Sequence, residues 1–291
     1  MKFGVNTLIW GAMFGPPDFH LLPRIKASGF DGIEVPILDP GAFEAEAVGR
    51  ELDRMGLERT AVAIVPGGTS LASSDASVRQ RACEHLEACI AAARDMGATM
   101  LAGPMYTPVG YLTGQRRTSE EWKWTIDSWQ RLATAVHAAH VEIALEPLNR
   151  FETYFLNTVA DATKLCDEIE DPSIGILLDT FHANIEEKSI GDAVRHAAPH
   201  LKHLHTCEND RGIPGSGHVA WQEFFSAVQE IGYNRWLTIE SFGFALGPLS
   251  AAAAIWRDLA STPEAIAFSG VQFLRAQTLS AHTKATQSGA A

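Results

Sequence analysis

The chain has 291 residues, of which 46% are hydrophobic, and a formal net charge of −12 at pH 7. This length fits either two average domains or one α/β barrel. Nucleic acids and anionic membranes are not attracted to an acidic surface, so we expect no nucleic-acid partner and no membrane partner.

The first residues and the cysteines add an expectation about location. The N-terminal stretch 1–17 alternates like a strand and shows no cleavage pattern of a signal peptide, and no apolar run reaches the length of a membrane span. The four cysteines form no CxxC pair and no disulfide-rich pattern. Together these features predict a cytoplasmic protein.

Short apolar runs alternate with longer amphipathic segments along the chain. The strand-like runs cover residues 3–9, 32–37, 59–65, 99–103, 141–146, 174–179, 201–205 and 236–240. The helix-like segments cover residues 18–28, 42–55, 76–96, 118–139, 159–170, 189–197, 220–231 and 249–279. In the fourth of them, Thr118 with Glu121 three residues later has the pattern of a capping box.

Eight strand–helix pairs in strict alternation predict a parallel sheet, and eight parallel strands close into a barrel. An open doubly wound sheet is the alternative, but the GxGxxG loop that usually follows its first strand is absent. We therefore expect a single-domain (β/α)8 TIM barrel over residues 1–280, with residues 281–291 as a flexible C-terminal tail.

Polar residues stand where each of the last four expected strands ends. They are Glu146, Asp179, His205 and Glu240. In (β/α)8 barrels the chemistry lies at this end of the strands, and neighbouring strands are about 5 Å apart, so the four side chains can converge on one ion. Three carboxylates and an imidazole suit Mn²⁺, Mg²⁺, Co²⁺ or a mixed-ligand Zn²⁺ site.

A polar rim without a metal is the alternative interpretation of these four residues. A single strand-end carboxylate often forms a salt bridge or caps the next helix, and a histidine on an apolar strand is often a satisfied core residue. Three crowded carboxylates without a cation would, however, raise one another's pKa. Nearby, we expect His203 to be a buried structural histidine below His205, and the glycine-rich stretch 212–217 to be a turn more readily than a phosphate-binding loop.

Four motifs resemble those of a known family. They are LEPLNRFE (145–152), LDTFHANIEE (178–187), HLHTCENDRG (203–212) and TIESF (238–242). They are similar to the motifs of the ketose 3-epimerases, which include D-tagatose, D-allulose (psicose) and L-ribulose 3-epimerases within the xylose isomerase-like TIM barrels. The likeness covers most of the chain, and the motifs at 178–187 and 145–152 are the most specific.

The resemblance implies a metal-dependent enzyme that inverts C3 of free ketohexoses or ketopentoses through a cis-enediolate. One divalent ion per subunit, Mn²⁺ in the first place and Co²⁺ or Mg²⁺ otherwise, would bind Glu146, Asp179, His205 and Glu240. Of these ligands, Glu146 and Glu240 would also act as acid and base. The residues implied to bind the sugar are Glu152, His182 and Arg211. The resemblance also implies a homodimer or homotetramer.

The chain departs from the family's pattern at positions near the far end of the sugar. Asn6 stands where an aromatic residue is common, residues 105–111 lack a tryptophan, and Val62 or its neighbour replaces a cysteine. The identity of the ketose is therefore open. A free sugar is favoured over a sugar phosphate because no Arg/Lys cluster marks a phosphate site.

Three other functions fit parts of this pattern. A metal-dependent lyase or dehydratase, or an enzyme of 3-keto sugars or C-glycosides, would also begin by removing a proton beside a carbonyl. An abasic-site endonuclease would need more histidine ligands and a basic surface. A sugar- or metal-binding barrel without activity would not need two opposed bases.

Overall fold

The structure is a computed structural model that describes residues 1–243, 247 and 251–288, with side chains described as far as residue 279. Eight parallel strands form a closed barrel in which each strand pairs with the next and β8 pairs with β1. The strands are β1 (Lys2–Asn6), β2 (Gly32–Pro36), β3 (Glu58–Val62), β4 (Met100–Gly103), β5 (Glu142–Leu145), β6 (Ile174–Asp179), β7 (Leu201–His205) and β8 (Trp236–Ile239).

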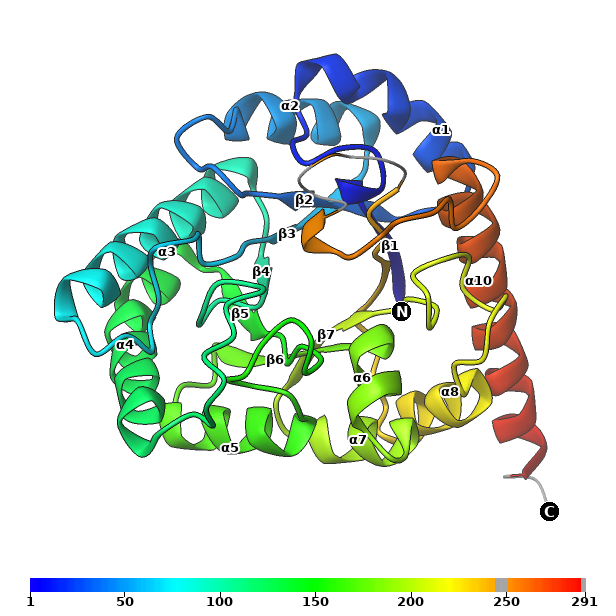
Figure 1. Cartoon of the computed structure of the whole chain (residues 1–291). Helices are drawn as coiled ribbons and strands as arrows, with labels where there is room; N and C mark the ends of the chain where they lie inside the picture. Colours follow the sequence, from blue (N-terminus) through cyan, green and yellow to red (C-terminus); the bar gives the residue numbers. More distant parts are fainter. Residues whose placement is uncertain (244–246, 248–250, 289–291) are drawn as a thin grey trace.

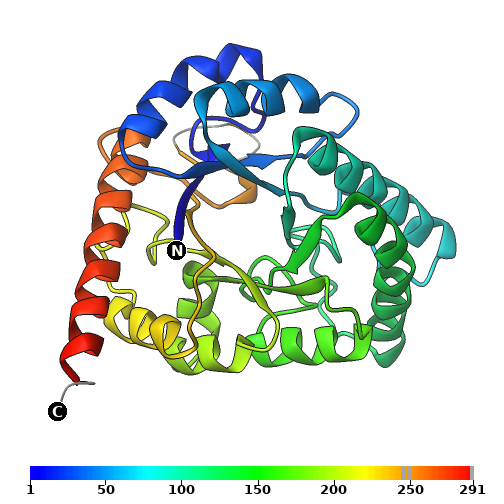
Figure 2. The same cartoon turned by 180° about the vertical axis from the view of Figure 1, so that it is seen from behind.

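Helices surround the barrel as an outer ring, seen from opposite sides in Figures 1 and 2. They are α1 (Leu22–Ala27), α2 (Ala45–Met55), α3 (Ala76–Met96), α4 (Ser119–Ala139), α5 (Val159–Ile169), α6 (Thr180–Glu186), α7 (Ile190–Ala197), α8 (Trp221–Glu230) and α10 (Pro263–Ser288). Thr118 and Glu121 form the expected capping box at the start of α4. The predicted (β/α)8 barrel is confirmed.

Three helical segments differ from the expectation. The segment expected as one helix over 18–28 is a 3₁₀ helix, Pro16–Leu21, followed by α1. The short helix α6 begins directly after β6 and was not expected. Of the helix expected over 249–279, residues 249 and 250 lie outside the described part of the chain, residues 251 and 252 are helical, and α10 begins separately at Pro263. Proline fits the first turn of a helix, and Thr262 accepts a hydrogen bond from the Ala265 N–H.

The C-terminal end of the chain is helical through Ser288 along α10, which lies beside α8 in the outer ring (Figure 1). That residues 281–291 form a flexible tail stays a prediction, and residues 289–291 lie outside the described part of the chain. Among the described residues, no helix is long and apolar enough to cross a membrane.

The inside of the barrel is divided between apolar and polar side chains. A small apolar cluster fills one part, with the members Leu8, Val62, Met100, Ala102, Ala144 and Leu177. Buried polar side chains from β1, β2, β3 and β7 fill another part, and they are Asn6, Glu34, Thr60 and His203. The main hydrophobic core lies between the strands and the helices. The strands end with their polar residues gathered at one rim.

Candidate active site

The four strand-end residues predicted as metal ligands meet at one point of the barrel rim. Glu146, Asp179, His205 and Glu240 each offer one ligand atom, and these atoms all lie within 4.8 Å of one another. Asp179 and His205 are directly paired across β6 and β7. All four side chains are buried, which removes the solvent that would otherwise stabilise their charges.

Three of these four side chains hold a buried atom without a hydrogen-bond partner among the described residues. The atoms are Glu146 Oε1, Asp179 Oδ2 and His205 Nδ1. The other oxygen of Asp179 caps α6 by accepting a hydrogen bond from the Phe181 N–H at 2.7 Å. Buried polar atoms without partners are rare in proteins, and a divalent cation at this point would satisfy all three. The residues present therefore fit a metal ion.

The two glutamates of the cluster have pKa values shifted in opposite directions. Burial, and then the charge of Glu240, raises the pKa of Glu146 well above its usual range. Burial also opposes ionisation of Glu240, but His205 and Arg211 outweigh it and lower the pKa of Glu240 to about 2. Two carboxyl groups with pKa values pushed apart are the arrangement that acid–base chemistry requires.

Burial likewise raises the pKa of Asp179. For His205, burial disfavours the cation, but the charges of Glu34 and Glu240 outweigh it and raise the pKa of the ring well above its usual value. Burial and the repulsion between the carboxylates thus oppose ionisation of Glu146 and Asp179, and a divalent cation between these side chains would favour their ionised forms.

The predicted sugar-binding residues stand next to this cluster. Arg211 donates from Nη1 to Glu240 Oε2 at 2.7 Å, and its Nη2 lies 3.1 Å from His182 Nε2. The His182 Nδ1 atom accepts the backbone N–H of Asn149 at 3.0 Å, while the Asn149 side chain donates to Glu152 at 2.8 Å. These contacts hold the three predicted side chains Glu152, His182 and Arg211 at the edge of the ligand cluster.

Arg211 is fixed by two aromatic rings and by its loop. Its guanidinium carbon lies 4.2 Å from the centroid of Phe181 and 4.7 Å from that of Phe242, within the range of cation–π contacts. Its backbone has a φ of 61°, in the left-handed region, and its carbonyl accepts a hydrogen bond from Ser241 at 2.7 Å. The site therefore presents a rigid cation.

The loop that carries Arg211 wraps around the buried carboxylate of Glu208. The two oxygens of Glu208 accept four hydrogen bonds, from the backbone N–H groups of Asn209, Gly215 and Val219 and from the indole of Trp221. The Gly215 N–H of the glycine-rich stretch 212–217 is thus committed to an internal carboxylate, in agreement with the expected turn.

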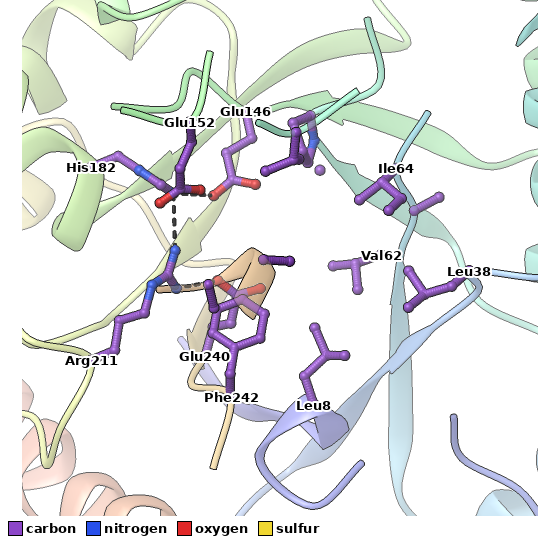
Figure 3. Close-up of a pocket in the computed structure, with 16 residues that line it drawn as sticks. Leu8, Leu38, Val62, Ile64, Glu146, Glu152, His182, Arg211, Glu240 and Phe242 are labelled. Atoms are coloured by element: carbon purple, nitrogen blue, oxygen red, sulfur yellow. Dashed lines mark hydrogen bonds and ion pairs between the residues drawn. The ribbon is translucent and has the colours of Figure 1, made fainter. Parts of the chain in front are cut away.

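A pocket of about 110 Å³ opens onto the cluster, with Glu146 and Glu240 in its wall. Figure 3 shows the polar side chains on one side of this pocket and Leu8, Leu38, Val62 and Ile64 on the other. One end of a bound molecule would therefore meet charged and hydrogen-bonding groups, and the other end would meet aliphatic side chains.

Sequence reasoning missed one member of this region, Glu34 of β2. Its carboxylate is fully buried and lies between His203 and His205, with Nε2–oxygen distances of 2.8 and 2.7 Å. The signal available in the sequence was a glutamate inside the otherwise apolar strand GIEVPI. His203 is fully buried, as expected; that its role is structural stays a prediction. Asn6, expected near the far end of the sugar, instead donates to Glu34 and Glu240.

Comparisons with known proteins place this barrel in a family. Residues 22–277 match the family model "Xylose isomerase-like TIM barrel". A probable ketose 3-epimerase of Synechocystis sp. is 38% identical over 94% of this chain and 96% of its own length. The solved structure of an L-ribulose 3-epimerase superposes with a TM-score of 0.92 at 30% identity, covering 98% of this chain and 97% of that one.

A D-allulose 3-epimerase from Methylomonas sp., solved in complex with D-allulose, has a TM-score of 0.90 at 26% identity, covering 95% of this chain and 97% of that one. The fold and the site define an enzyme of the xylose isomerase-like TIM barrel class. Within that class, the chain belongs to the ketose 3-epimerase family, whose members are carbohydrate epimerases.

Proposed function

We propose that this protein is a metal-dependent ketose 3-epimerase that inverts C3 of free ketohexoses or ketopentoses. The observation that carries the proposal is the pair Glu146 and Glu240: both are buried in the wall of one pocket, and both belong to the four-ligand cluster. One of them can give a proton while the other takes one.

Glu146, Asp179, His205 and Glu240 would hold the divalent ion. When bound, the ion would withdraw electrons from the oxygens of the sugar and so make the C3 hydrogen more acidic. Glu146 and Glu240 then act on C3 from its two faces: one removes the C3 proton and the other returns a proton to the opposite face. Because each can play either part, the same site serves both epimers.

The remaining residues of the pocket bind and orient the sugar. Arg211, His182 and Glu152 provide a cation, an imidazole and a carboxylate beside the cluster, where the C1–C3 end of the sugar would lie. The aliphatic side chains of Leu8, Leu38, Val62 and Ile64 face the other end and offer few hydrogen bonds to C4–C6. We therefore infer that the enzyme discriminates weakly among ketoses that differ at C4–C6.

Three further properties belong to this proposal. Mn²⁺ is the proposed metal, with Co²⁺ or Mg²⁺ as alternatives, because three carboxylates and one imidazole suit these hard ions.

A homodimer or homotetramer is proposed from the exposed aromatic rings of Phe151 and Trp256, which are 71% and 77% exposed. A cytoplasmic location is proposed because all four cysteines are buried and unpaired.

The test is C3 epimerisation and C3–H exchange in D₂O. Protein loaded with Mn²⁺ is incubated with D-fructose, D-tagatose and L-ribulose, and the products are followed by chromatography and ¹H NMR. We expect the C3 epimer of at least one sugar, and a loss of exchange of about 100-fold or more in Glu146→Gln and in Glu240→Gln. The metal content of each variant is measured to separate lost acid–base chemistry from lost metal, and Glu168→Gln on α5 is the control.

Two results would contradict the proposal. Substantial exchange surviving in both glutamine variants would exclude the two-base mechanism. Loss of a hydroxyl with new ultraviolet absorbance, and no C3 epimer from any common ketose, would instead indicate a dehydratase.

A further inference from the structure

Glu34 is a buried carboxylate that lies within hydrogen-bonding distance of two histidines from across the barrel. Its Oε1 atom accepts from Asn6 Nδ2 at 3.0 Å and lies 2.7 Å from His205 Nε2. Its Oε2 atom accepts from Thr60 Oγ1 at 2.9 Å and lies 2.8 Å from His203 Nε2. The side chain is fully buried, so no solvent competes for these oxygens.

The position of Glu34 follows from the register of the first three strands. Asn6, Glu34 and Thr60 are direct neighbours across β1, β2 and β3, so their side chains point into the barrel at the same level. His203 and His205 lie on β7 with the spacing of two residues that puts both side chains on one face of the strand. The carboxylate therefore meets both rings inside the barrel.

The contacts decide which nitrogen of His205 carries a hydrogen. A carboxylate with four polar partners on its two oxygens acts only as an acceptor, so the ring nitrogen that faces it must donate. That nitrogen is Nε2. In the neutral ring the lone pair is then on Nδ1, the atom that points into the four-ligand cluster, 3.5 Å from Glu240 Oε2 and 4.0 Å from Glu146 Oε1.

Asn6 connects Glu34 to Glu240, a second proposed metal ligand. Its Nδ2 atom, which donates to Glu34, lies 3.3 Å from Glu240 Oε1. Among the described residues, Nδ1 of His205 has no hydrogen-bond partner, so in the neutral tautomer described above its lone pair can face a cation. A metal-bound histidine usually donates its other N–H to a carboxylate or carbonyl, which fixes its tautomer and orientation and strengthens it as a ligand.

We propose that Glu34 is a positioning residue of the metal site: it holds a hydrogen on His205 Nε2 and thereby presents the Nδ1 lone pair to the divalent cation. This inference rests on the proposed metal site but not on the proposed reaction. A purely structural role would give Glu34 an effect on stability alone. A positioning role gives it an effect on metal affinity and on the His205 ring.

The experiment measures Mn²⁺ binding by calorimetry in the wild type, Glu34→Gln and Thr60→Val. Glutamine offers one neutral carbonyl oxygen, so it cannot accept from both histidines, and we expect the affinity for Mn²⁺ to fall about 10- to 100-fold. Thr60→Val removes a donor to the other oxygen of Glu34 and keeps the contact with His205. We expect it to lower stability and leave the Mn²⁺ affinity within about twofold.

Long-range ¹H–¹⁵N spectra of the Mg²⁺-loaded wild type give an independent readout, because Mg²⁺ is diamagnetic. We expect a hydrogen on Nε2 of His205 and none on Nδ1. A hydrogen on Nδ1 with a bare Nε2 would overturn the proposal, as would a folded Glu34→Gln that binds Mn²⁺ as tightly as the wild type. If Glu34→Gln does not fold, the wild-type ring spectrum decides.

The outcomes also separate this inference from the proposed function. A wild-type protein that binds Mn²⁺, shows the expected ring spectrum and epimerises no ketose would refute the epimerase proposal alone. A wild-type protein that binds no divalent ion would refute both.

Discussion

Replacing Glu208 by glutamine tests whether the loop that carries Arg211 depends on one buried carboxylate. Each oxygen of Glu208 accepts two hydrogen bonds: Oε1 from the N–H groups of Asn209 and Val219, and Oε2 from Gly215 and the Trp221 indole. Glutamine keeps one oxygen and puts an NH₂ group in the place of the other, so two of the four donors lose their acceptor.

The size of the effect follows from these contacts. A buried donor left without an acceptor costs about 1–3 kcal/mol, so two such donors cost about 2–6 kcal/mol. Some relaxation of the loop reduces the upper value, and we expect Glu208→Gln to lower the free energy of unfolding by about 3–4 kcal/mol. Since Arg211 lies in the same loop, we also expect KM for the ketose to rise about tenfold.

The assay is urea-induced unfolding followed by circular dichroism. The dependence of the free energy of unfolding on urea concentration should be the same in wild type and variant. The control is Asp192→Asn, which removes an exposed carboxylate paired with Arg195 and should change stability by less than about 0.5 kcal/mol. A loss below about 1 kcal/mol for Glu208→Gln, or an equal loss in the control, would refute the reasoning.

The contribution of Glu208 to the free energy of unfolding depends on pH in a defined direction. Burial opposes ionisation of Glu208, but its hydrogen bonds from Trp221, Asn209, Val219 and Gly215 outweigh it and lower its pKa. Its folded-state pKa therefore lies below the value of about 4.3 in the unfolded chain. The ionised carboxylate stabilises the fold above that pH, and the stabilisation is lost as the pH falls through the folded-state pKa. The stability difference between wild type and variant should shrink in acid.

Two further predictions concern the metal and the cation of the site. Chelation of the metal should lower the melting temperature of the protein by on the order of 10 °C, because a ligand at 1,000 times its Kd stabilises the fold by about 4 kcal/mol. Added Mn²⁺ should restore the melting temperature. A change under about 2 °C in calorimetry would contradict a contribution of the ion to stability. Arg211→Lys should raise KM about 10- to 100-fold in steady-state kinetics, since lysine cannot place a planar fork between Phe181 and Phe242. An unchanged KM would show that this stacking is not needed for binding.

The ligand cluster was predictable because each of its members ends a strand. Glu146, Asp179, His205 and Glu240 each follow an apolar run, and in a closed parallel barrel the ends of neighbouring strands are necessarily close. A local pattern and one topological rule were therefore sufficient. The expected helix over 249–279 joined α10 to the helical residues 251 and 252, because both segments have the composition of a helix and propensity alone does not locate a terminus.

Glu34 and the loop around Glu208 depend on contacts that no local pattern contains. Glu34 reaches residues 169 and 171 positions away in the chain, and it does so across the inside of the barrel. Its partners are set by the register of β1, β2 and β3 and by the curvature that brings β7 opposite. The four donors of Glu208 likewise come together only when the loop closes on itself.

The sequence by itself determined the alternation of strands and helices, the barrel and the identity of the residues at its rim, because periodicity and strand-end position are properties of short segments. The tertiary structure decided which buried atoms remain without partners, which nitrogen of His205 faces the cluster and how the pKa values of Glu146 and Glu240 separate. These depend on distances and burial across the barrel, which arise only when all eight strands have closed.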